Sequence, residues 1–208
     1  MEKVSKRKIG VFGGTFDPIH FGHLLLAEQA RDEAGLDKVI FIPAGAPPFK
    51  QGTDVSETHH RYAMIRLAIE DNKRFEVSDM EIKRKGISYT VTTLDECKKK
   101  LGKDSEIYFI VGTDAFLSME KWVQAERLFK EYPIIVGSRA GSRDEERDRL
   151  ADKLRNEYGA EIIIAFMPKI EISSTDIKSR LHEGRSLKYI LPPEVEEYIK
   201  EKGLYGNY

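Results

Sequence analysis

Two histidines, an aspartate, a threonine and two adjacent glycines are crowded into the segment GGTFDPIHFGH, residues 13–23. His20 and His23 are three positions apart, so both rings can face the same side of the chain where a helix begins. Gly13 and Gly14 let the backbone pass close to a bulky ligand, and N–H groups at a helix start attract anions. Imidazole donors can stabilise charge that grows in a transition state. These residue types at this spacing indicate a site for a reacting phosphate group.

Other interpretations of this segment fit the residues less well. A zinc site needs three or four ligands, and Cys97 and His182 lack the spacing to complete one, so no metal site built from side chains is expected. A dinucleotide fingerprint would read G-x-G-x-x-G, with an acidic residue at the end of the second strand. Here the glycines are adjacent, and the second expected strand ends in IPAGAPP, which contains no acid.

The segment lies between a short apolar run and a stretch with helical periodicity, and this alternation continues along the chain. Runs rich in β-branched and aromatic residues predict strands at Ile9–Phe12, Val39–Ile42, Phe75–Val77, Ile107–Val111, Ile134–Val136 and Ile162–Ala165. Apolar residues at helical spacing predict helices at Gly22–Ala34, His59–Glu70, Thr92–Leu101, Val123–Lys130, Asp144–Glu157, Ser174–His182 and Pro193–Lys202. Apolar strands separated by helices predict an α/β fold with a doubly wound parallel sheet, Rossmann-like in type. Ligands of such sheets bind at the carboxyl ends of the strands, which is where GGTFDPIHFGH begins.

Length and composition limit the domain number, the ligands and the cellular location that we expect. The chain has 208 residues, which suits a single domain over residues 1–208 with a small helical part at about 172–208. The net charge of −1 gives no general attraction for nucleic acid, so any polyanion has to be held by a local cluster of cations. The single cysteine, Cys97, cannot form an internal disulfide, and MEKVSKRK precedes no run long enough for a signal peptide or a membrane span. A cytoplasmic location without membrane attachment is expected.

A local cluster of cations occurs in ISSTDIKSR, residues 172–180. Ser173 or Ser174 can cap the helix expected there and leave its N–H groups available to an anion. Lys178 and Arg180 then project cations from the helix. The alternative is an ordinary capped helix with a solvated basic face.

Other polar residues stand beside the expected strands and helices. Ser88, Tyr89 and Thr90 in ISYT precede a helix, whose N–H groups can hold a carboxylate. Asp114 in IVGTDAF follows a strand, so it can accept hydrogen bonds from ribose hydroxyls or cap a helix. Gly112, two residues earlier, permits close approach of a ligand.

Two further cations lie near loops. Lys50 ends GAPPFK in a long loop rich in glycine and proline, and Arg139 in SRAGS follows an expected strand. From the residues alone, Lys50 is equally well explained as a solvated loop side chain; the phosphate-binding role considered for both cations comes from the family resemblance described next.

At these motifs the sequence resembles the nucleotidyltransferase superfamily, whose T/H-x-G-H signature GGTFDPIHFGH matches. The likeness is strongest to the bacterial nicotinate mononucleotide adenylyltransferases. ISYTVTTL, IVGTDAF with Trp122 downstream, ISSTDIKSR and ILPPEVEEYIKEKGLY occur in the expected order over nearly the whole chain. Three positions depart from the family pattern: Phe49 replaces a histidine, Lys178 replaces an arginine, and Ala140 interrupts an RPG motif.

The resemblance implies a role for each matching residue. Catalysis would depend on His20, His23, Lys178 and Arg180, which would neutralise charge on the leaving pyrophosphate. ATP and its phosphates would be bound by Gly13, Gly14, Thr15, Phe16, Lys50, Ser173, Ser174, Thr175 and Ile177. The mononucleotide would be bound by Ser88, Tyr89, Thr90, Gly112, Asp114, Trp122 and Arg139, with its carboxylate at Ser88–Thr90 and its pyridine ring on Trp122.

The implied reaction joins ATP and nicotinate mononucleotide to give deamido-NAD and pyrophosphate in NAD biosynthesis. The mononucleotide phosphate is already an anionic nucleophile, so positioning and charge stabilisation are sufficient. Mg²⁺ would accompany ATP and use few protein ligands. ATP and nicotinate mononucleotide are the expected partners, and the oligomeric state is left open, with a homo-oligomer among the options. The alternatives are a sister transferase acting on pantetheine phosphate, glycerol 3-phosphate or nicotinamide mononucleotide, a nucleotide-binding protein without catalysis, and an NAD-dependent oxidoreductase.

Overall fold

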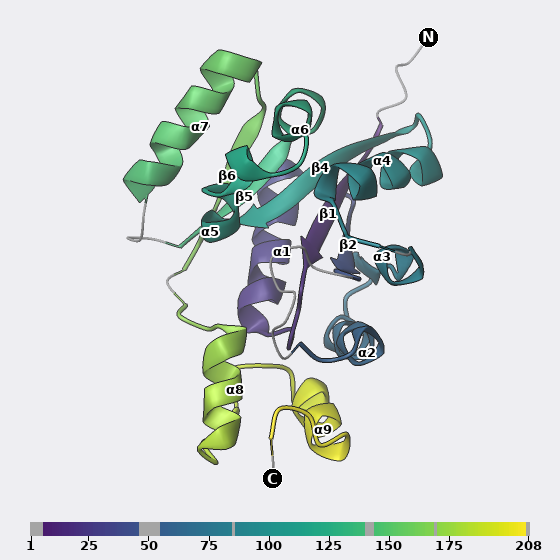
Figure 1. The fold of residues 1–208 in the computed structure, drawn as a ribbon, viewed down its shortest axis with the longest axis vertical. Helices are drawn as coiled ribbons and strands as arrows, with labels where there is room; N and C mark the ends of the chain where they lie inside the picture. The colour runs from purple at the N-terminus through teal and green to yellow at the C-terminus, as the bar shows by residue number, and fades with distance from the viewer. Residues whose placement is uncertain (1–5, 46–54, 85, 140–143, 169, 207–208) are drawn as a thin grey trace.

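The computed structural model describes residues 6–45, 55–84, 86–139, 144–168 and 170–206. One parallel sheet runs through it in the order β3-β2-β1-β4-β5-β6 (Figure 1). Its strands are β1 (Arg7–Gly14), β2 (Lys38–Pro43), β3 (Phe75–Val77), β4 (Ser105–Gly112), β5 (Ile134–Arg139) and β6 (Ile162–Met167). The order runs outward in both directions from the neighbours β1 and β4, which is the doubly wound arrangement. The predicted fold class is confirmed.

Helices connect the strands and cover the sheet. They are α1 (Phe21–Ala34), α2 (Thr58–Ala68), α3 (Met80–Lys83), α4 (Thr90–Leu101), α5 (Thr113–Phe116), the 3₁₀ turn η1 (Met119–Lys121), α6 (Ala125–Glu131), α7 (Asp144–Tyr158), α8 (Ser174–His182) and α9 (Pro193–Glu201). Every predicted strand and helix is present, with ends within a few residues of the prediction. The short α3, α5 and η1 were not predicted, because three or four residues carry no helical periodicity.

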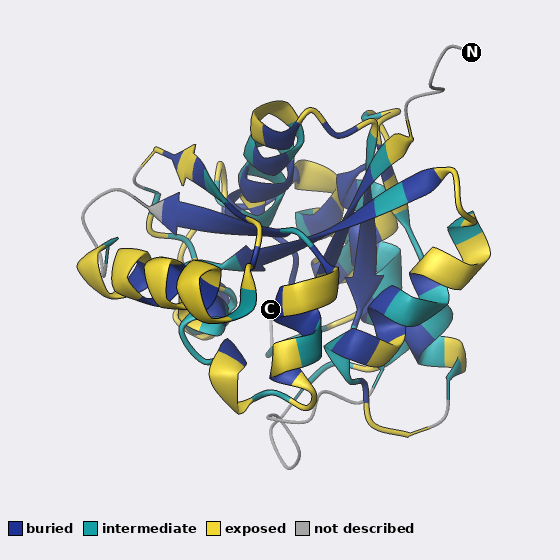
Figure 2. Cartoon of the chain, turned by 90° about the horizontal axis from the view of Figure 1, so that it is seen from above, coloured by how far each residue is buried: buried dark blue, intermediate teal, exposed yellow. Residues whose placement is uncertain are grey.

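Alternation along each strand divides the interior into two hydrophobic cores. Phe12, Phe41 and Ile110 point to one face and form the α1 core, where α1, α2, α8 and α9 pack. Val11 and Phe109 point to the other face and form the α4 core, where α4, α6 and α7 pack. Because successive side chains of a strand face opposite sides, every strand except the short β3 contributes to both cores. Figure 2 shows the result as buried strands between helices whose outer faces are exposed.

The C-terminal helical part packs beneath the sheet, beside α1 and α2 (Figure 1). Leu191, Val195 and Ile199 belong to the α1 core, and His60 Nδ1 lies 2.9 Å from the Tyr198 hydroxyl, which joins α2 to α9. The single-domain organisation stays a prediction. Within the described residues, no helix has both the length and the apolar content needed to span a bilayer.

Candidate active site

A cavity of about 600 Å³ opens at the carboxyl ends of β1, β4, β5 and β6. It includes the junction of β1 and β4, where the strand order reverses, and this is where doubly wound sheets bind ligands. Its volume suits a small-molecule substrate. The sequence-predicted residues on its wall are Gly13, Gly14, Thr15, Phe16, His23, Ser88, Tyr89, Thr90, Gly112, Asp114 and Trp122.

The remaining predicted residues lie elsewhere in the structure. Of those that the structure describes, His20, Ser173, Ser174, Thr175, Ile177, Lys178 and Arg180 are outside the cavity wall. Arg139 ends β5, and nothing is described of its side chain. Lys50, together with the departures at Phe49 and Ala140, lies outside the described residues.

The two motif histidines are stacked, with ring centroids 3.8 Å apart and ring planes 24° apart. His20 is the N-cap of α1 and is 3% exposed, whereas His23 in the first turn reaches the cavity. Gly22 between them makes the stack possible, because a Cβ there would lie 3.0 Å from His20 Nδ1. The prediction that both rings face one side is confirmed. The structure adds that His20 supports the cavity-lining His23 from behind.

Phe16 supports His23 from another side. Its ring meets that of His23 edge-on at 5.0 Å and that of Phe12 edge-on at 5.3 Å. Its backbone is left-handed, with φ of 50°, an uncommon conformation for a residue other than glycine. Gly14 accommodates the ring, since a Cβ there would lie 2.9 Å from it. The loop after β1 therefore presents His23 on a frame of aromatic rings.

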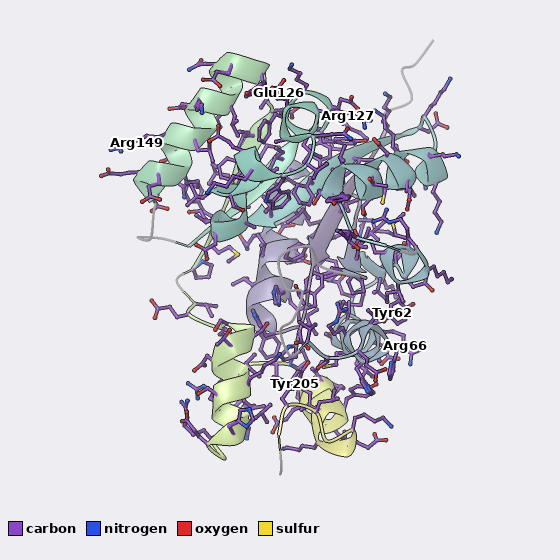
Figure 3. All side chains as sticks on the ribbon, in the orientation of Figure 1. Tyr62, Arg66, Glu126, Arg127, Arg149 and Tyr205 are labelled. Atoms are coloured by element: carbon purple, nitrogen blue, oxygen red, sulfur yellow. The ribbon has the colours of Figure 1, made fainter. Side chains whose placement is uncertain are left out.

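Asp17 is the hub of the same loop, and the sequence interpretation gave it no role. Its carboxylate accepts hydrogen bonds from Lys178 Nζ at 2.5 Å, from the Tyr205 hydroxyl at 2.5 Å and from Ser56 N at 3.3 Å. Figure 3 labels Tyr205 near α8 and α9, at the foot of the molecule. Burial raises the pKa of Asp17, but the bonds from Lys178 and Tyr205 outweigh it and leave the pKa below 3.8. Asp17 is therefore a buried carboxylate that stays ionised at neutral pH.

Two hydrogen bonds join the basic helix α8 to the loop after β1: Lys178 donates to Asp17, and Ser174 donates to Pro18 O. Ser173 caps it by accepting from Asp176 N at 3.1 Å, as predicted, and the Ser174 hydroxyl donates to Pro18 O at 3.0 Å. Arg180 Nε donates to Asp176 Oδ2 at 2.7 Å, and Lys178 pairs with Asp17. The side chain of Ile177 is fully buried in the α1 core, so any contact with ATP has to come from its main chain.

Another part of the cavity wall is suited to an aromatic ring that carries a carboxylate. α4 begins at Thr90, its N-cap residue Tyr89 makes no side-chain capping bond, and the positive helix end lies at the cavity wall. The indole of Trp122 is fixed by donation to Ser118 Oγ at 3.1 Å and by edge-on packing against Phe109. Asp114 lies on the wall, but it is not a helix cap: α5 begins at Thr113 with Gly112 as N-cap, so the capping alternative was wrong. A helix of four residues gives no sequence signal for its start.

Two buried charged residues near the cavity were also missed. Glu81 lies on the wall, accepts a hydrogen bond from the Thr93 hydroxyl and is 3.7 Å from Arg84. Arg61 lies on the buried face of α2, in phase with Met64, Ile65 and Ala68. An arginine at an apolar position of a helix was the one available signal for Arg61. Glu81 gave none, because α3 is too short to show a phase.

Comparison with known proteins agrees with this geometry. The model of the cytidylyltransferase-like family matches residues 11–180. A relative from Thermoanaerobacter sp. (strain X514), named a probable nicotinate-nucleotide adenylyltransferase, is 46% identical over 95% of this chain and 94% of its own. The chain belongs to the nicotinate-nucleotide adenylyltransferase family. A further relative of the same name, from Desulfitobacterium hafniense, is 45% identical over 96% of both chains.

Solved structures of the adenylyltransferase family share the fold. The Plasmodium falciparum nicotinic acid mononucleotide adenylyltransferase complexed with NaAD superposes with a TM-score of 0.78. It is 21% identical, and the match covers 96% of this chain and 97% of that one. At this identity the match shows that the two chains share a fold.

Proposed function

We propose that this adenylyltransferase joins the adenylyl group of ATP to the phosphate of nicotinate mononucleotide, giving deamido-NAD and pyrophosphate. The observation that carries the proposal is the content of one cavity. His23, stacked on the buried His20, lines it beside a glycine-rich loop, together with a tryptophan and a helix start whose N-cap residue makes no side-chain capping bond. The first two features suit phosphates, and the last two suit an aromatic ring that bears a carboxylate.

The chain's residues supply position and charge in this reaction. An oxygen of the mononucleotide phosphate attacks the α-phosphorus of ATP, and the bond from that phosphorus to the bridging oxygen of the leaving pyrophosphate breaks. Gly13, Gly14 and Thr15 hold the reacting groups at the end of β1, and His23 donates a hydrogen bond to the charge that grows. Lys178 and Arg180 add positive charge from α8, where their carboxylate partners also orient them.

The acceptor is selected at the other motifs. The pyridine ring packs on Trp122, and its carboxylate lies at the start of α4, near Ser88 and Thr90. An amide in place of the carboxylate lacks the negative charge that the helix start favours. Discrimination against nicotinamide mononucleotide follows from these N–H donors, which an amide matches poorly.

We include Mg²⁺ as the companion of ATP. Asp114 is an exposed carboxylate on the cavity wall and is the kind of hard oxygen ligand that Mg²⁺ takes one or two of beside phosphate oxygens. Bound there, the ion would neutralise part of the triphosphate charge. ATP and nicotinate mononucleotide are accordingly the proposed partners.

An acceptor comparison tests the proposal. The protein is incubated with ATP, Mg²⁺ and one acceptor at a time: nicotinate mononucleotide, nicotinamide mononucleotide, pantetheine phosphate or glycerol 3-phosphate. Pyrophosphate is measured together with the dinucleotide or other adduct. The expected result is fastest turnover with nicotinate mononucleotide. Faster turnover with another acceptor would identify a sister transferase, and ATP binding without pyrophosphate release would identify a non-catalytic binding protein.

A further inference from the structure

Arg61 is a buried cation that donates to backbone carbonyls of the loops after two different strands. It is 1% exposed, whereas Arg66, labelled on the same helix in Figure 3, is exposed. Nη1 donates to Thr15 O at 2.9 Å, Nη2 to Ala44 O at 2.7 Å and Nε to Ser56 O at 3.0 Å. Burial lowers the pKa of this guanidinium, and the charge of Asp17 opposes that effect.

Packing alone does not explain an arginine at this position. The residues in phase with it, Met64 and Ile65, are apolar and fully buried, and an apolar residue would fill the same space without the cost of burying a charge. The planar fork of the guanidinium can hold several acceptors in fixed directions at once, which an apolar residue cannot do. The three carbonyls are therefore the features that require arginine.

The bond to Thr15 reaches the part of the cavity wall where the phosphates are proposed to bind, at Gly13–Thr15 and His23; we call this the phosphate side. Because the peptide group is planar, fixing the Thr15 carbonyl also fixes the direction of the Phe16 N–H. Phe16 has a left-handed backbone, which persists only where its surroundings determine it. Its ring is edge-on to that of His23 at 5.0 Å. The Arg61 bond thus holds the residue that supports His23.

The bond to Ala44 reaches the part of the wall where the mononucleotide is proposed to bind, at Ser88, Thr90 and Trp122; we call this the acceptor side. The N–H at the other end of that peptide group, on Gly45, donates to Ser88 Oγ at 3.2 Å, and Ser88 lines the cavity. Ala44 N also donates to Gly14 O at 2.8 Å, which joins the two loops directly. A single guanidinium is therefore connected to His23 through Phe16 and to Ser88 through Gly45.

We propose that Arg61 is a positioning residue that sets the distance between the phosphate side and the acceptor side of the cavity. This inference rests on the proposed adenylyl transfer. Loss of the guanidinium lets the two loops move relative to each other, and a displacement of about 1 Å at reacting groups lowers kcat on the order of 100-fold. Binding of ATP alone needs only one of the two loops and changes less.

The test compares Arg61→Ala with Met64→Ala, a fully buried neighbour on α2 that lies outside the cavity wall. Both changes weaken the α1 core, but the arginine change alone should lower kcat by about 100-fold at similar ATP affinity. Free guanidinium, at concentrations far below those that unfold proteins, should restore turnover to Arg61→Ala and leave Met64→Ala unchanged. Arg61→Lys keeps the charge without the fork and should still lose roughly 10-fold in kcat. If Arg61→Ala does not fold, Arg61→Lys takes its place in the comparison with Met64→Ala.

The outcomes separate the two levels of the argument. A wild-type protein that forms no dinucleotide would overturn the proposed function and the role of Arg61 with it. An active wild type with an Arg61→Ala kcat equal to that of Met64→Ala, or a fully active Arg61→Lys, would overturn the positioning role alone. Recovery of thermal stability by guanidinium without recovery of turnover would do the same.

Discussion

Lys178 Nζ lies 2.5 Å from Asp17 Oδ2, which joins helix α8 to the loop after β1 across 161 positions of sequence. Tyr205, near the C-terminal end, donates to the other oxygen of the same carboxylate. Two side chains of the C-terminal helical part, Lys178 and Tyr205, therefore converge on one buried carboxylate of the loop after β1, beside the bond from Ser174 to Pro18 O. The pairing with Asp17 therefore fixes the orientation of the Lys178 side chain.

Asp17→Asn should destabilise the protein in a pH-dependent way. The asparagine keeps the shape but loses a charge-assisted bond to Lys178, at a cost of roughly 1.5–3 kcal/mol in the free energy of unfolding. The pKa of Asp17 is lowered below 3.8 in the fold, so its stabilisation is complete above 3.8 and is lost as the pH falls through the folded value. Urea unfolding of both proteins from neutral to acidic pH measures the difference.

Asp79→Asn is the matched control for this change. Asp79 pairs with Lys83 at 2.8 Å on the surface, and an exposed pair contributes little to the free energy of unfolding. Equal losses for the two variants, or a difference between wild type and Asp17→Asn that does not shrink in acid, would contradict the hub role of Asp17.

His23→Ala should lose about 100-fold or more in kcat, as removal of one preorganised donor at a developing charge commonly does. The KM for nicotinate mononucleotide should change less, because the proposed site of the acceptor ring is at Trp122 and not at His23. Steady-state kinetics with each substrate varied measures both constants. His59→Ala is the control, since that ring is 62% exposed and lies outside the cavity wall. A near-normal kcat for His23→Ala would remove His23 from the mechanism.

Gly22→Ala should lower activity while leaving the helix at least as stable. Alanine has a higher helix propensity than glycine, but at this second position of α1 the new methyl would lie 3.0 Å from His20 Nδ1. His20 is buried and has little room to move, so its ring is pushed against His23. Thermal unfolding and kcat are measured together, with Gln29→Ala on the same helix as control. An active Gly22→Ala would show that the stack is not required.

Trp122→Ala should raise the KM for nicotinate mononucleotide roughly 10- to 100-fold, which corresponds to the loss of one stacked aromatic ring. The KM for ATP should change little, because the tryptophan lies on the acceptor side. Trp122→Phe keeps an aromatic surface and should recover most of the affinity. Alanine kinetics in which the KM for ATP rises instead would place the adenine, and not the pyridine, against Trp122.

The fold was predictable because its elements carry strong periodic signals. Val39–Ile42 and Ile107–Val111 are apolar on both faces, as expected of strands between two helical layers. The adjacent glycines and the histidine spacing then located the site at the end of β1. What these signals share is that they are local: each can be read within about a dozen residues.

The contacts that assemble the site join residues far apart in the chain, so no local pattern predicts them. Asp17 is 161 positions from Lys178 and 188 positions from Tyr205. Arg61 is 46 positions from Thr15. Propensity for α-helix was enough to place α2 and α8, but which acceptor each buried cation would find depended on the tertiary packing.

The most direct test of the central claim follows the phosphorus atoms of ATP. The protein is incubated with nicotinate mononucleotide, Mg²⁺ and ATP labelled in the α- or in the γ-phosphate, and the products are separated. Adenylyl transfer predicts that the α label appears in deamido-NAD and the γ label in pyrophosphate. A γ label on the acceptor or in inorganic phosphate, with no dinucleotide formed, would contradict the account.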